Sequence, residues 1–301
     1  MKVVELSGGV GGARLARGLA ALDRVDLTVV VNVGDDAENH GLHISPDLDT
    51  VAYTLARMEG PLGWGRADDT FHFNEELARF GLDNRFQLGD RDLALKMFRT
   101  RRMAEGASLS EVTGEVARAF GLETSLLPAT NDRVRTRVEI EEGWVSFQEY
   151  FVDRRHQDSV IGLEYQGADI AAPAPGVLEA IEDADIVLIG PSNPPLSIQP
   201  IVAIEEIRTA LTEHPKVLAV SPLVGGKALK GPADRVMASL GYPPGTRGVV
   251  SAYRGMVDLL IVDTRDAGDI GEIDGVMVET ADTLMPDEEA SIRLAKELMG
   301  R

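Results

Sequence analysis

The chain has 301 residues, and its 30 lysines and arginines against 49 aspartates and glutamates give a formal net charge of −19. It contains no cysteine, which excludes disulfide scaffolds, thiolate zinc sites and cysteine nucleophiles. The acidic excess argues against a nucleic-acid partner, and because no segment resembles a signal peptide or a membrane span, we expect a cytoplasmic protein with no membrane partner.

Short apolar runs separated by helical patterns predict the fold. Residues 3–6 and 27–31 flank a helical pattern over 13–22, which predicts a strand-helix-strand unit. Three further runs are typical of strands buried on both faces: 185–189, 217–220 and 259–262. This alternation predicts an α/β protein with a Rossmann-like, mostly parallel sheet and helices on both faces, and its ligands should bind at the carboxyl ends of the strands.

The middle of the chain has a different pattern. Residues 74–80, 93–105 and 110–120 are predicted helices, and residues 133–140 and 144–151 alternate as in a β-hairpin. A last helix is predicted over 286–299. We therefore expect a single domain over 1–301, with a core of 1–58 and 161–301 and a helical plus β-hairpin insertion at 59–160.

A glycine-rich segment follows the first predicted strand and leads into a helix. Its residues are Ser7, Gly8, Gly9, Val10, Gly11 and Gly12. Backbone N–H groups and the positive end of a helix dipole can bind phosphate at such a position. Arg14 replaces the third glycine of the dinucleotide fingerprint, and the Lys-Ser/Thr pair of a Walker A loop is missing. The segment predicts a phosphate loop, and the alternative is a turn that only packs helix on strand.

Four aspartates are expected near the same edge of the sheet: Asp35, Asp36, Asp47 and Asp49. The last two begin a predicted helix, with Ser45 as N-cap and Pro46 at its first position, so either could simply stabilise the helix dipole. Carboxylates beside a phosphate are also how proteins hold Mg²⁺. The concentration of acids favours a metal role for at least one of them, in a crevice shared with the glycine segment.

A locally basic helix is predicted after Gly89, carrying Arg91, Lys96, Arg99, Arg101 and Arg102. For Arg91, between two aspartates, we expect a buried or ligand-facing role, because a guanidinium so placed binds anions or carboxylates. For Arg101 and Arg102 we expect a solvated face with charge pairs.

Polar loops follow two later strands. Ser192, Asn193 and Ser197 could bind a base, sugar or phosphate, and Lys227 and Lys230 could add positive charge. No Gly-x-Ser-x-Gly elbow supports a serine hydrolase. A zinc site is disfavoured as well, because the two neighbouring histidines at positions 40 and 43 have no further ligand in their loop.

Together these motifs resemble the 2-phospho-L-lactate transferases of deazaflavin coenzyme F-420 biosynthesis, called phosphoenolpyruvate transferases in many bacteria. The resemblance is carried by ordered segments at 7–13, 31–36, 45–50, 63–65, 69–70, 88–93, 147–150, 190–201 and 220–232. It implies transfer of a phosphoenolpyruvyl or 2-phospho-L-lactyl group from a guanosine diphosphate adduct to the deazaflavin Fo (7,8-didemethyl-8-hydroxy-5-deazariboflavin), with release of GMP. It also implies Mg²⁺ as cofactor and a homodimer.

The resemblance assigns roles to residues of this chain. Asp35, Asp49 and Arg91 are implied to be catalytic, Asp35 and Asp49 to bind the metal, and Asp49 and Arg91 to contact the deazaflavin. The full set of implied substrate-binding residues is Ser7, Gly8, Gly9, Gly11, Gly12, Asn32, Asp47, Asp49, Arg91, Ser192, Asn193 and Ser197. Asp49 could also orient or deprotonate the acceptor hydroxyl, and this role stays open beside the metal role.

Three positions depart from the family pattern. Gln199 stands where glycine is usual, Leu95-Lys96 where Thr-His is usual, and Asn131 where serine is common. The lysine weakens any proposal of a histidine base there and leaves the organic acid of the donor open.

Two other functions are possible on the same fold. The gluconeogenesis-factor family of nucleotide-sugar-binding regulators shares the glycine loop, but the segments 89–92 and 147–150 favour the transferase. A nicotinamide dehydrogenase is disfavoured by Arg14 and by Asn32, which stands where an acidic residue would bind the ribose.

Overall fold

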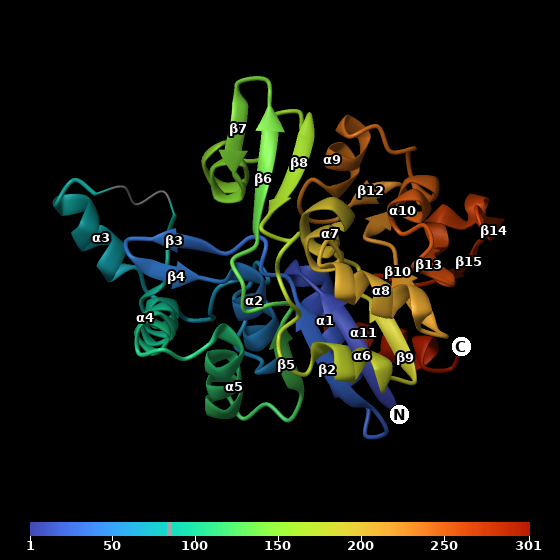
Figure 1. Ribbon diagram of the computed structural model, residues 1–301, viewed down its shortest axis with the longest axis horizontal. Coiled ribbons are helices and arrows are strands. Elements are labelled where there is room, and N and C mark those ends of the chain that lie inside the picture. The colour runs from blue at the N-terminus through green and yellow to red at the C-terminus, as the bar shows by residue number, and fades with distance from the viewer. Residues whose placement is uncertain (83–85) are drawn as a thin grey trace.

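The computed structural model describes residues 1–82 and 86–301 (Figure 1). Its main sheet has eight strands, which in spatial order are β14 (Gly271–Ile273), β15 (Val276–Ala281), β13 (Leu259–Asp263), β10 (Val217–Val220), β9 (Ile186–Ile189), β1 (Lys2–Ser7), β2 (Asp26–Val31) and β5 (Ser125–Pro128). All neighbours are parallel except β14 and β15. The chain order reverses between β1 and β9, which is where doubly wound folds bind ligands.

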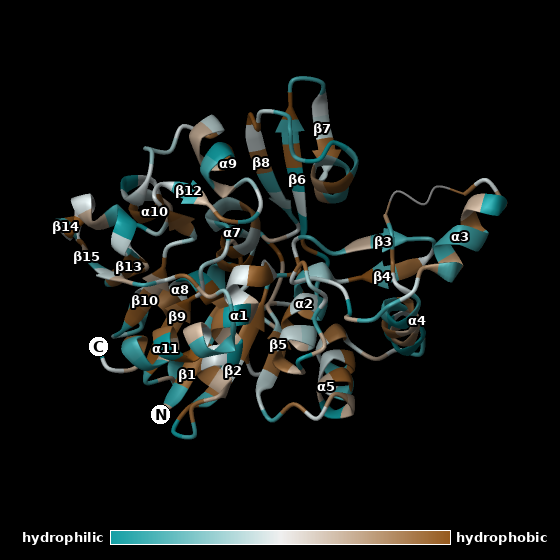
Figure 2. Ribbon diagram, turned by 180° about the vertical axis from the view of Figure 1, so that it is seen from behind, coloured by the Kyte–Doolittle hydropathy of each residue, from teal (hydrophilic) through white to brown (hydrophobic). Residues whose placement is uncertain are grey.

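Helices cover both faces of this sheet, so the predicted α/β fold is confirmed (Figures 1 and 2). One face carries α1 (Gly9–Ala20), α2 (Pro46–Leu55) and α11 (Glu288–Leu298), and α1 packs on both of the others. The other face carries α6 (Val177–Glu182) and α8 (Glu205–Glu213). Strands β9 and β10 are buried at every residue, because helices lie on both of their faces.

The five strands predicted at 3–6, 27–31, 185–189, 217–220 and 259–262 are confirmed as β1, β2, β9, β10 and β13. The helix predicted over 13–22 is α1, but it begins at Gly9 because the glycine segment forms its first turn. Strands β5 and β15 were not predicted. β5 has four residues and ends in proline, and β15 alternates buried and exposed residues instead of forming one apolar run.

The predicted middle helices are present as α3 (His72–Arg79), α4 (Asp90–Ala104) and α5 (Leu109–Ala119), and the last helix as α11. The predicted hairpin is formed by β6 (Arg135–Ile140) and β7 (Gly143–Ser146). Its second strand is shorter than expected, because the chain turns into a π-helix over Glu149–Asp153. Within residues 1–82 and 86–301, no helix has the length and apolar character needed to cross a membrane.

The limits expected for the insertion differ from the architecture at two points. β5 lies inside 59–160 but is an edge strand of the main sheet. β8 (Gly162–Gln166) lies beyond 160 but pairs with β6. The three-stranded sheet β7-β6-β8 and the ribbon of β3 (Ala37–Asn39) and β4 (Leu42–Ile44) project from the carboxyl edge of the main sheet (Figure 1). They therefore stand over the edge where ligands are expected.

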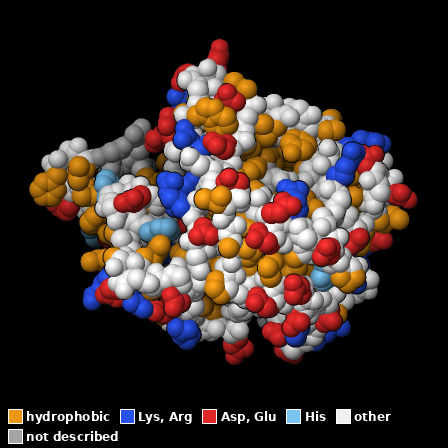
Figure 3. Space-filling model, viewed as in Figure 1, with side chains coloured by type: hydrophobic (Ala, Val, Ile, Leu, Met, Phe, Trp, Pro, Cys, Tyr) orange, Lys and Arg blue, Asp and Glu red, His pale blue; other side chains and the backbone are white. Residues whose placement is uncertain are grey.

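On the face seen in Figure 3, acidic side chains are spread among apolar and neutral ones, and histidine side chains lie between basic and acidic groups on the side of the β3–β4 ribbon. Shorter helices complete the carboxyl edge beside β9 and β10: α7 (Gln199–Val202), α9 (Ala233–Ser239) and α10 (Thr246–Ala252).

Candidate active site

The glycine segment packs directly against the loop after β9, at the reversal of the strand order. The Gly8 N–H donates to the Ser192 hydroxyl over 3.1 Å. A Cβ atom on Gly11 would collide with the carbonyl oxygen of Pro191, and one on Gly12 with the hydroxyls of Ser7 and Ser192. Glycine is therefore required because the two backbones approach each other this closely. Two implied substrate-binding groups, the glycine segment with its Ser7 and the Ser192 loop, form one wall.

Asp47 lies at the start of α1, where a phosphate was expected. The Gly9 N–H donates to its Oδ1 over 2.8 Å, and the Asn32 side-chain amide donates to its Oδ2 over 2.9 Å. Asn32 in turn accepts from the Gly34 N–H over 2.7 Å. The expected meeting of the acidic residues and the glycine segment is thus present, through a carboxylate at the positive end of the helix.

Asp35 and Asp36 lie beside Asp47 and are buried. Within the described chain, the Oδ1 atom of each has no hydrogen-bond partner. Burial, and then the nearby Asp47, raise the pKa of Asp35 well above its usual value. Burial also raises the pKa of Asp47 to about 6, although Asn32 and Gly9 donate to it. We call Asp35, Asp36 and Asp47 the acidic group; among the described residues no lysine or arginine lies at ion-pairing distance from any of the three, and only His43 lies at that distance from Asp36.

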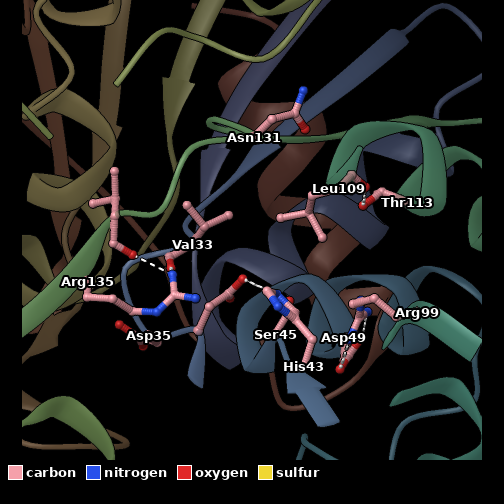
Figure 4. Close-up of polar contacts among 12 residues, drawn as sticks. Val33, Asp35, His43, Ser45, Asp49, Arg99, Leu109, Thr113, Asn131 and Arg135 are labelled. Carbon is pink, nitrogen blue, oxygen red and sulfur yellow. Dashed lines mark hydrogen bonds and ion pairs between the residues drawn. The ribbon is translucent and has the colours of Figure 1, made fainter. Parts of the chain in front are cut away.

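Ser45 and His43 complete this side of the site (Figure 4). Ser45 stands at the N-cap position of α2 and Pro46 follows it, but its hydroxyl caps nothing and instead donates to Asp36 Oδ2 over 2.9 Å. His43 Nε2 lies 3.0 Å from the same oxygen. The N-cap expectation was therefore right in position and wrong in the partner of the hydroxyl.

Asp49 is held by two cations of α4, of which Figure 4 shows Arg99. Lys96 Nζ lies 2.7 Å from its Oδ2, and the Arg99 guanidinium binds both of its oxygens. Lys96 and Arg99 are each only 3% exposed. Burial alone would raise the pKa of Asp49, but Arg99 and Lys96 outweigh it and hold the pKa below its usual value. We call Asp49, Lys96 and Arg99 the cation clamp.

The clamp continues into a second buried acid. Lys96 also pairs with Asp92, which accepts a hydrogen bond of 2.6 Å from the Tyr53 hydroxyl. The roles of Lys96 and Arg99 were missed in the sequence. Their spacing of three places both on one face of α4, and this was the available signal, but nothing in the local sequence distinguished that face from the solvated one.

Two alternatives were expected for Arg91, a buried side chain or a ligand-facing one, and the buried alternative is wrong. Its side chain is exposed at the start of α4, and its backbone N–H donates to Asp69 Oδ1 over 2.8 Å. Contact of Arg91 with a ligand stays a prediction. The solvated charge pairs expected for Arg101 and Arg102 are confirmed, since both bind Glu105 and Arg102 also binds Glu115.

Two other implied residues lie at the same reversal point. Asn193 uses its side-chain oxygen to accept from the Leu196 N–H over 3.3 Å, which caps the π-helical turn Pro194–Ile198. Ser197 is buried, and its Cβ would stand 2.6 Å from a Cβ on Gly8. Both residues therefore shape the wall against the glycine segment.

A cavity of about 280 Å³ lies next to the acidic group, between the β3–β4 ribbon and the end of β7. Its lining includes Ala37, Asn39, Ile44, Phe86 and Gln148. The Gln148 side-chain amide donates to the carbonyl of Asp35 over 2.8 Å, so one residue lines the cavity and also holds the acidic loop. The sequence had pointed to 147–150 only through the family resemblance.

The donor set for a metal ion is partial. Over residues 1–82 and 86–301, no three His, Asp or Glu residues are grouped so that they could hold a metal by themselves. The unpartnered oxygens of Asp35 and Asp36 beside Asp47 fit Mg²⁺, which commonly uses one or two carboxylates together with phosphate oxygens and water. Asp49 fits less well, because both of its oxygens are already bound by the clamp.

Comparison with known proteins places this arrangement among transferases. The family model described as 2-phospho-L-lactate transferase CofD matches residues 3–297. The chain is 44% identical over 304 residues to a 2-phospho-L-lactate transferase of Methanopyrus kandleri, covering 99% of this chain and 97% of the relative. It is 41% identical over 310 residues to a phosphoenolpyruvate transferase of Streptomyces coelicolor, with 99% and 97% covered.

A solved structure has the same fold at low sequence identity. A protein of the UPF0052 family from Bacillus halodurans superposes with a TM-score of 0.67 at 18% identity, covering 99% of this chain and 98% of that one. This likeness concerns the fold alone.

Proposed function

This chain belongs to the 2-phospho-L-lactate transferase CofD family, and from that premise we propose that it transfers a phosphoenolpyruvyl or 2-phospho-L-lactyl group from a guanosine diphosphate adduct to the deazaflavin Fo, releasing GMP. The observation that carries the proposal is the meeting of the glycine segment, Ser192 and the acidic group at the reversal of the strand order. Backbone N–H groups there suit a diphosphate, and carboxylates suit the cation that accompanies it.

The proposed reaction is an in-line displacement at the β-phosphorus. The acceptor hydroxyl oxygen forms a bond to that phosphorus, and the bond from the phosphorus to the bridging oxygen of GMP breaks. The hydroxyl proton goes to a carboxylate, for which Asp35 and Asp36 each offer an oxygen with no partner in the described chain. Because Asp35 is also the proposed metal ligand, Asp36 is the proposed acceptor of this proton.

Charge stabilisation and positioning supply most of the catalysis in such transfers. We propose that Mg²⁺ is held by Asp35 and Asp47, where it would neutralise the diphosphate. Asp49 keeps its implied role at metal and acceptor only if substrate binding releases one of its oxygens from Lys96 or Arg99. Otherwise its contribution is to fix α2 against α4, and thereby the position of Asp47 two residues earlier.

The cavity beside the acidic group is the proposed site for the ring system of the acceptor. Its volume of about 280 Å³ lies near the lower end of small-molecule sites, ~300 Å³. Ile44 and Phe86 give it apolar walls, and the side-chain nitrogen of Asn39 is buried without a partner among the residues described. Arg91 is proposed to approach the acceptor from outside this cavity.

The test is a transfer assay with Fo, Mg²⁺ and guanosine diphosphate adducts of lactate, enolpyruvate and glycerate in competition. We expect GMP release and one dominant phosphodiester product by mass spectrometry, which also identifies the acid. Tight binding of a UDP-sugar with no GMP release from any donor would contradict the proposal and select the nucleotide-sugar regulator.

A further inference from the structure

Arg135 is a half-buried cation near Asp35 and Asp36. It opens β6, and β6 begins against the loop that carries the acidic group, since the Thr136 N–H donates to the Gly34 carbonyl over 2.8 Å. One guanidinium nitrogen, Nη1, donates to the carbonyls of Val134 at 2.6 Å and Val33 at 3.4 Å. The side chain is thus tethered over the Val33–Asp36 turn by a single nitrogen (Figure 4).

The remaining donors of this guanidinium are uncommitted. Arginine carries five N–H donors in a planar fork. Within residues 1–82 and 86–301, Nε and Nη2 of Arg135 make no hydrogen bond, and the side chain makes no ion pair. Asp35 and Asp36 act on it electrostatically, yet neither carboxylate is within ion-pairing distance. A half-buried cation beside a crevice, held but not neutralised by its own chain, is suited to an anionic ligand.

The position of Arg135 identifies which anion. Asp35 is close enough to Asp47, which binds the glycine segment, to be influenced by its charge, and its carbonyl accepts from Gln148, which lines the cavity. If the diphosphate is at the glycine segment and the acceptor in the cavity, the three-carbon acid of the donor lies between them. That acid carries a carboxylate, and a guanidinium binds a carboxylate through two parallel hydrogen bonds.

We propose that Arg135 binds the carboxylate of the organic acid that is esterified to the transferred phosphate. Arg135 thereby selects donors whose organic group carries a free carboxylate. This inference rests on the proposed function and extends it to the recognition of one donor group. Arg135 is a binding and specificity residue here; no bond is made or broken at its atoms.

The test compares two guanosine diphosphate adducts, that of lactate and that of lactamide, in which a neutral amide replaces the carboxylate. Their dissociation constants are measured with the wild-type chain and with Arg135→Gln, Arg135→Lys and Arg133→Gln in the presence of Mg²⁺. Arg133 is exposed and lies two residues earlier, so its variant removes the same charge from an exposed side chain.

We expect the wild-type chain to prefer the lactate adduct by about 10- to 100-fold, the usual value of a hydrogen-bonded charge pair. Arg135→Gln should lose this preference while binding the lactamide adduct as the wild type does, and its KM for the lactate adduct should rise with little change in kcat. Arg135→Lys should retain part of the preference, and Arg133→Gln all of it.

Two outcomes would overturn the inference: a preference that survives in Arg135→Gln, or an equal loss for both adducts, which would place the guanidinium on the phosphates or in loop support. The proposed function fails separately, because wild-type protein that binds neither adduct contradicts the donor site itself.

Discussion

Asp47 and Asp49 are two residues apart in the first turn of α2, and both are buried. Their surroundings nevertheless shift the pKa values of the two carboxyls in opposite directions. Asp47 faces the glycine segment and the other members of the acidic group, and burial raises its pKa to about 6. Asp49 faces α4, where burial is outweighed by Arg99 and Lys96, and its pKa is lowered. Residue type, helix position and burial are shared, so the neighbouring charges decide the difference.

The two groups differ in whether the chain itself supplies counter-charges for their buried carboxylates. The cation clamp supplies its own counter-charges and therefore contributes to the packing of α2 on α4. The acidic group has no such counter-charge at ion-pairing distance from Asp35 or Asp47 in the described chain, and an added cation would relieve its repulsion. Four experiments test this division.

Removing the guanidinium from the clamp should have the largest effect. Arg99→Met leaves Asp49 buried with Lys96 alone, which Asp92 also engages. We expect the free energy of unfolding to fall by about 3 kcal/mol, because breaking a buried ion pair leaves an uncompensated charge. Urea unfolding near neutral pH measures this.

A double variant controls that experiment. Arg99→Met with Asp49→Leu removes both charges and should recover much of the stability, since Lys96 keeps Asp92 as its partner. A loss below about 1 kcal/mol for Arg99→Met alone would show that the clamp is not the stabilising element.

The acidic group should respond in the opposite way. Asp35→Asn is expected to lower the transfer rate by at least about 100-fold, as when one electrostatic partner of a transition state is removed. The same variant should be as stable as wild type, or more stable by on the order of 1 kcal/mol near pH 8, because a buried repulsive charge is gone.

The exposed Asp23 offers a matched substitution, Asp23→Asn, which should change neither quantity. Asp49→Asn should instead lose stability and activity together, since it leaves Lys96 and Arg99 without their shared acid. Near-normal turnover in both Asp35→Asn and Asp49→Asn would remove the argument for a carboxylate-bound metal.

The third experiment follows stability against pH. Asp35 and Asp47 have raised pKa values in the folded chain, so these two carboxyls bind more protons in the folded state than in the unfolded state above about pH 4. Without metal, stability should therefore fall as the pH rises from about 4 to about 6.5, by on the order of 2 kcal/mol. Urea titrations with and without MgCl₂ test this, and Mg²⁺ should stabilise more near pH 8 than near pH 5.

Glu5 must be removed from that comparison, because it is fully buried in β1 and burial raises its pKa as well. Glu5→Gln subtracts its contribution, and the part of the slope that Asp35→Asn then removes from the Glu5→Gln background belongs to the acidic group. A flat profile in Glu5→Gln, with no effect of Mg²⁺ at either pH, would contradict the repulsion inferred for Asp35 and Asp47.

The smallest effect is expected on the outer face of α4. Arg101 is exposed and pairs with Glu105, and such a pair loses in side-chain entropy and solvent screening most of what it gains. Arg101→Ala should leave the urea midpoint unchanged within error. A clear destabilisation would mean that the solvated and buried faces of this helix are not as different as Arg99 and Arg101 indicate.

The central sheet could be predicted because its strands are local apolar runs. β1, β9 and β10 are buried on both faces, and such strands are visible without knowledge of their neighbours. β5 and β15 were missed for the converse reason: their place in the sheet depends on pairing with β2 and β13, which are distant in sequence. The local sequence of a short or half-buried strand does not show which distant strand it pairs with.

For the site, the sequence predicted that the aspartates lie near the glycine segment. It did not predict that Asp47 binds that segment whereas Asp49 pairs with the cations of α4. The meeting of Asp47 with the glycine segment follows from loops at one sheet edge. That Asp49 turns to α4 depends on how an insertion packs, and Lys96 and Arg99 look locally like the exposed arginines that follow them. The ion-pair partner of a buried charge depends on how distant helices pack, and residue spacing within one helix does not reveal it.

With Asp47 seated at the start of α1, the crevice discriminates among anions before it recognises any base or sugar. Sulfate or inorganic phosphate arriving alone meets a carboxylate already hydrogen-bonded to Gly9 and Asn32 and is repelled by it. We expect a nucleotide that arrives with a divalent cation to bind better, because the cation would neutralise that carboxylate. Sulfate and inorganic phosphate are therefore expected to be poor inhibitors of the proposed site.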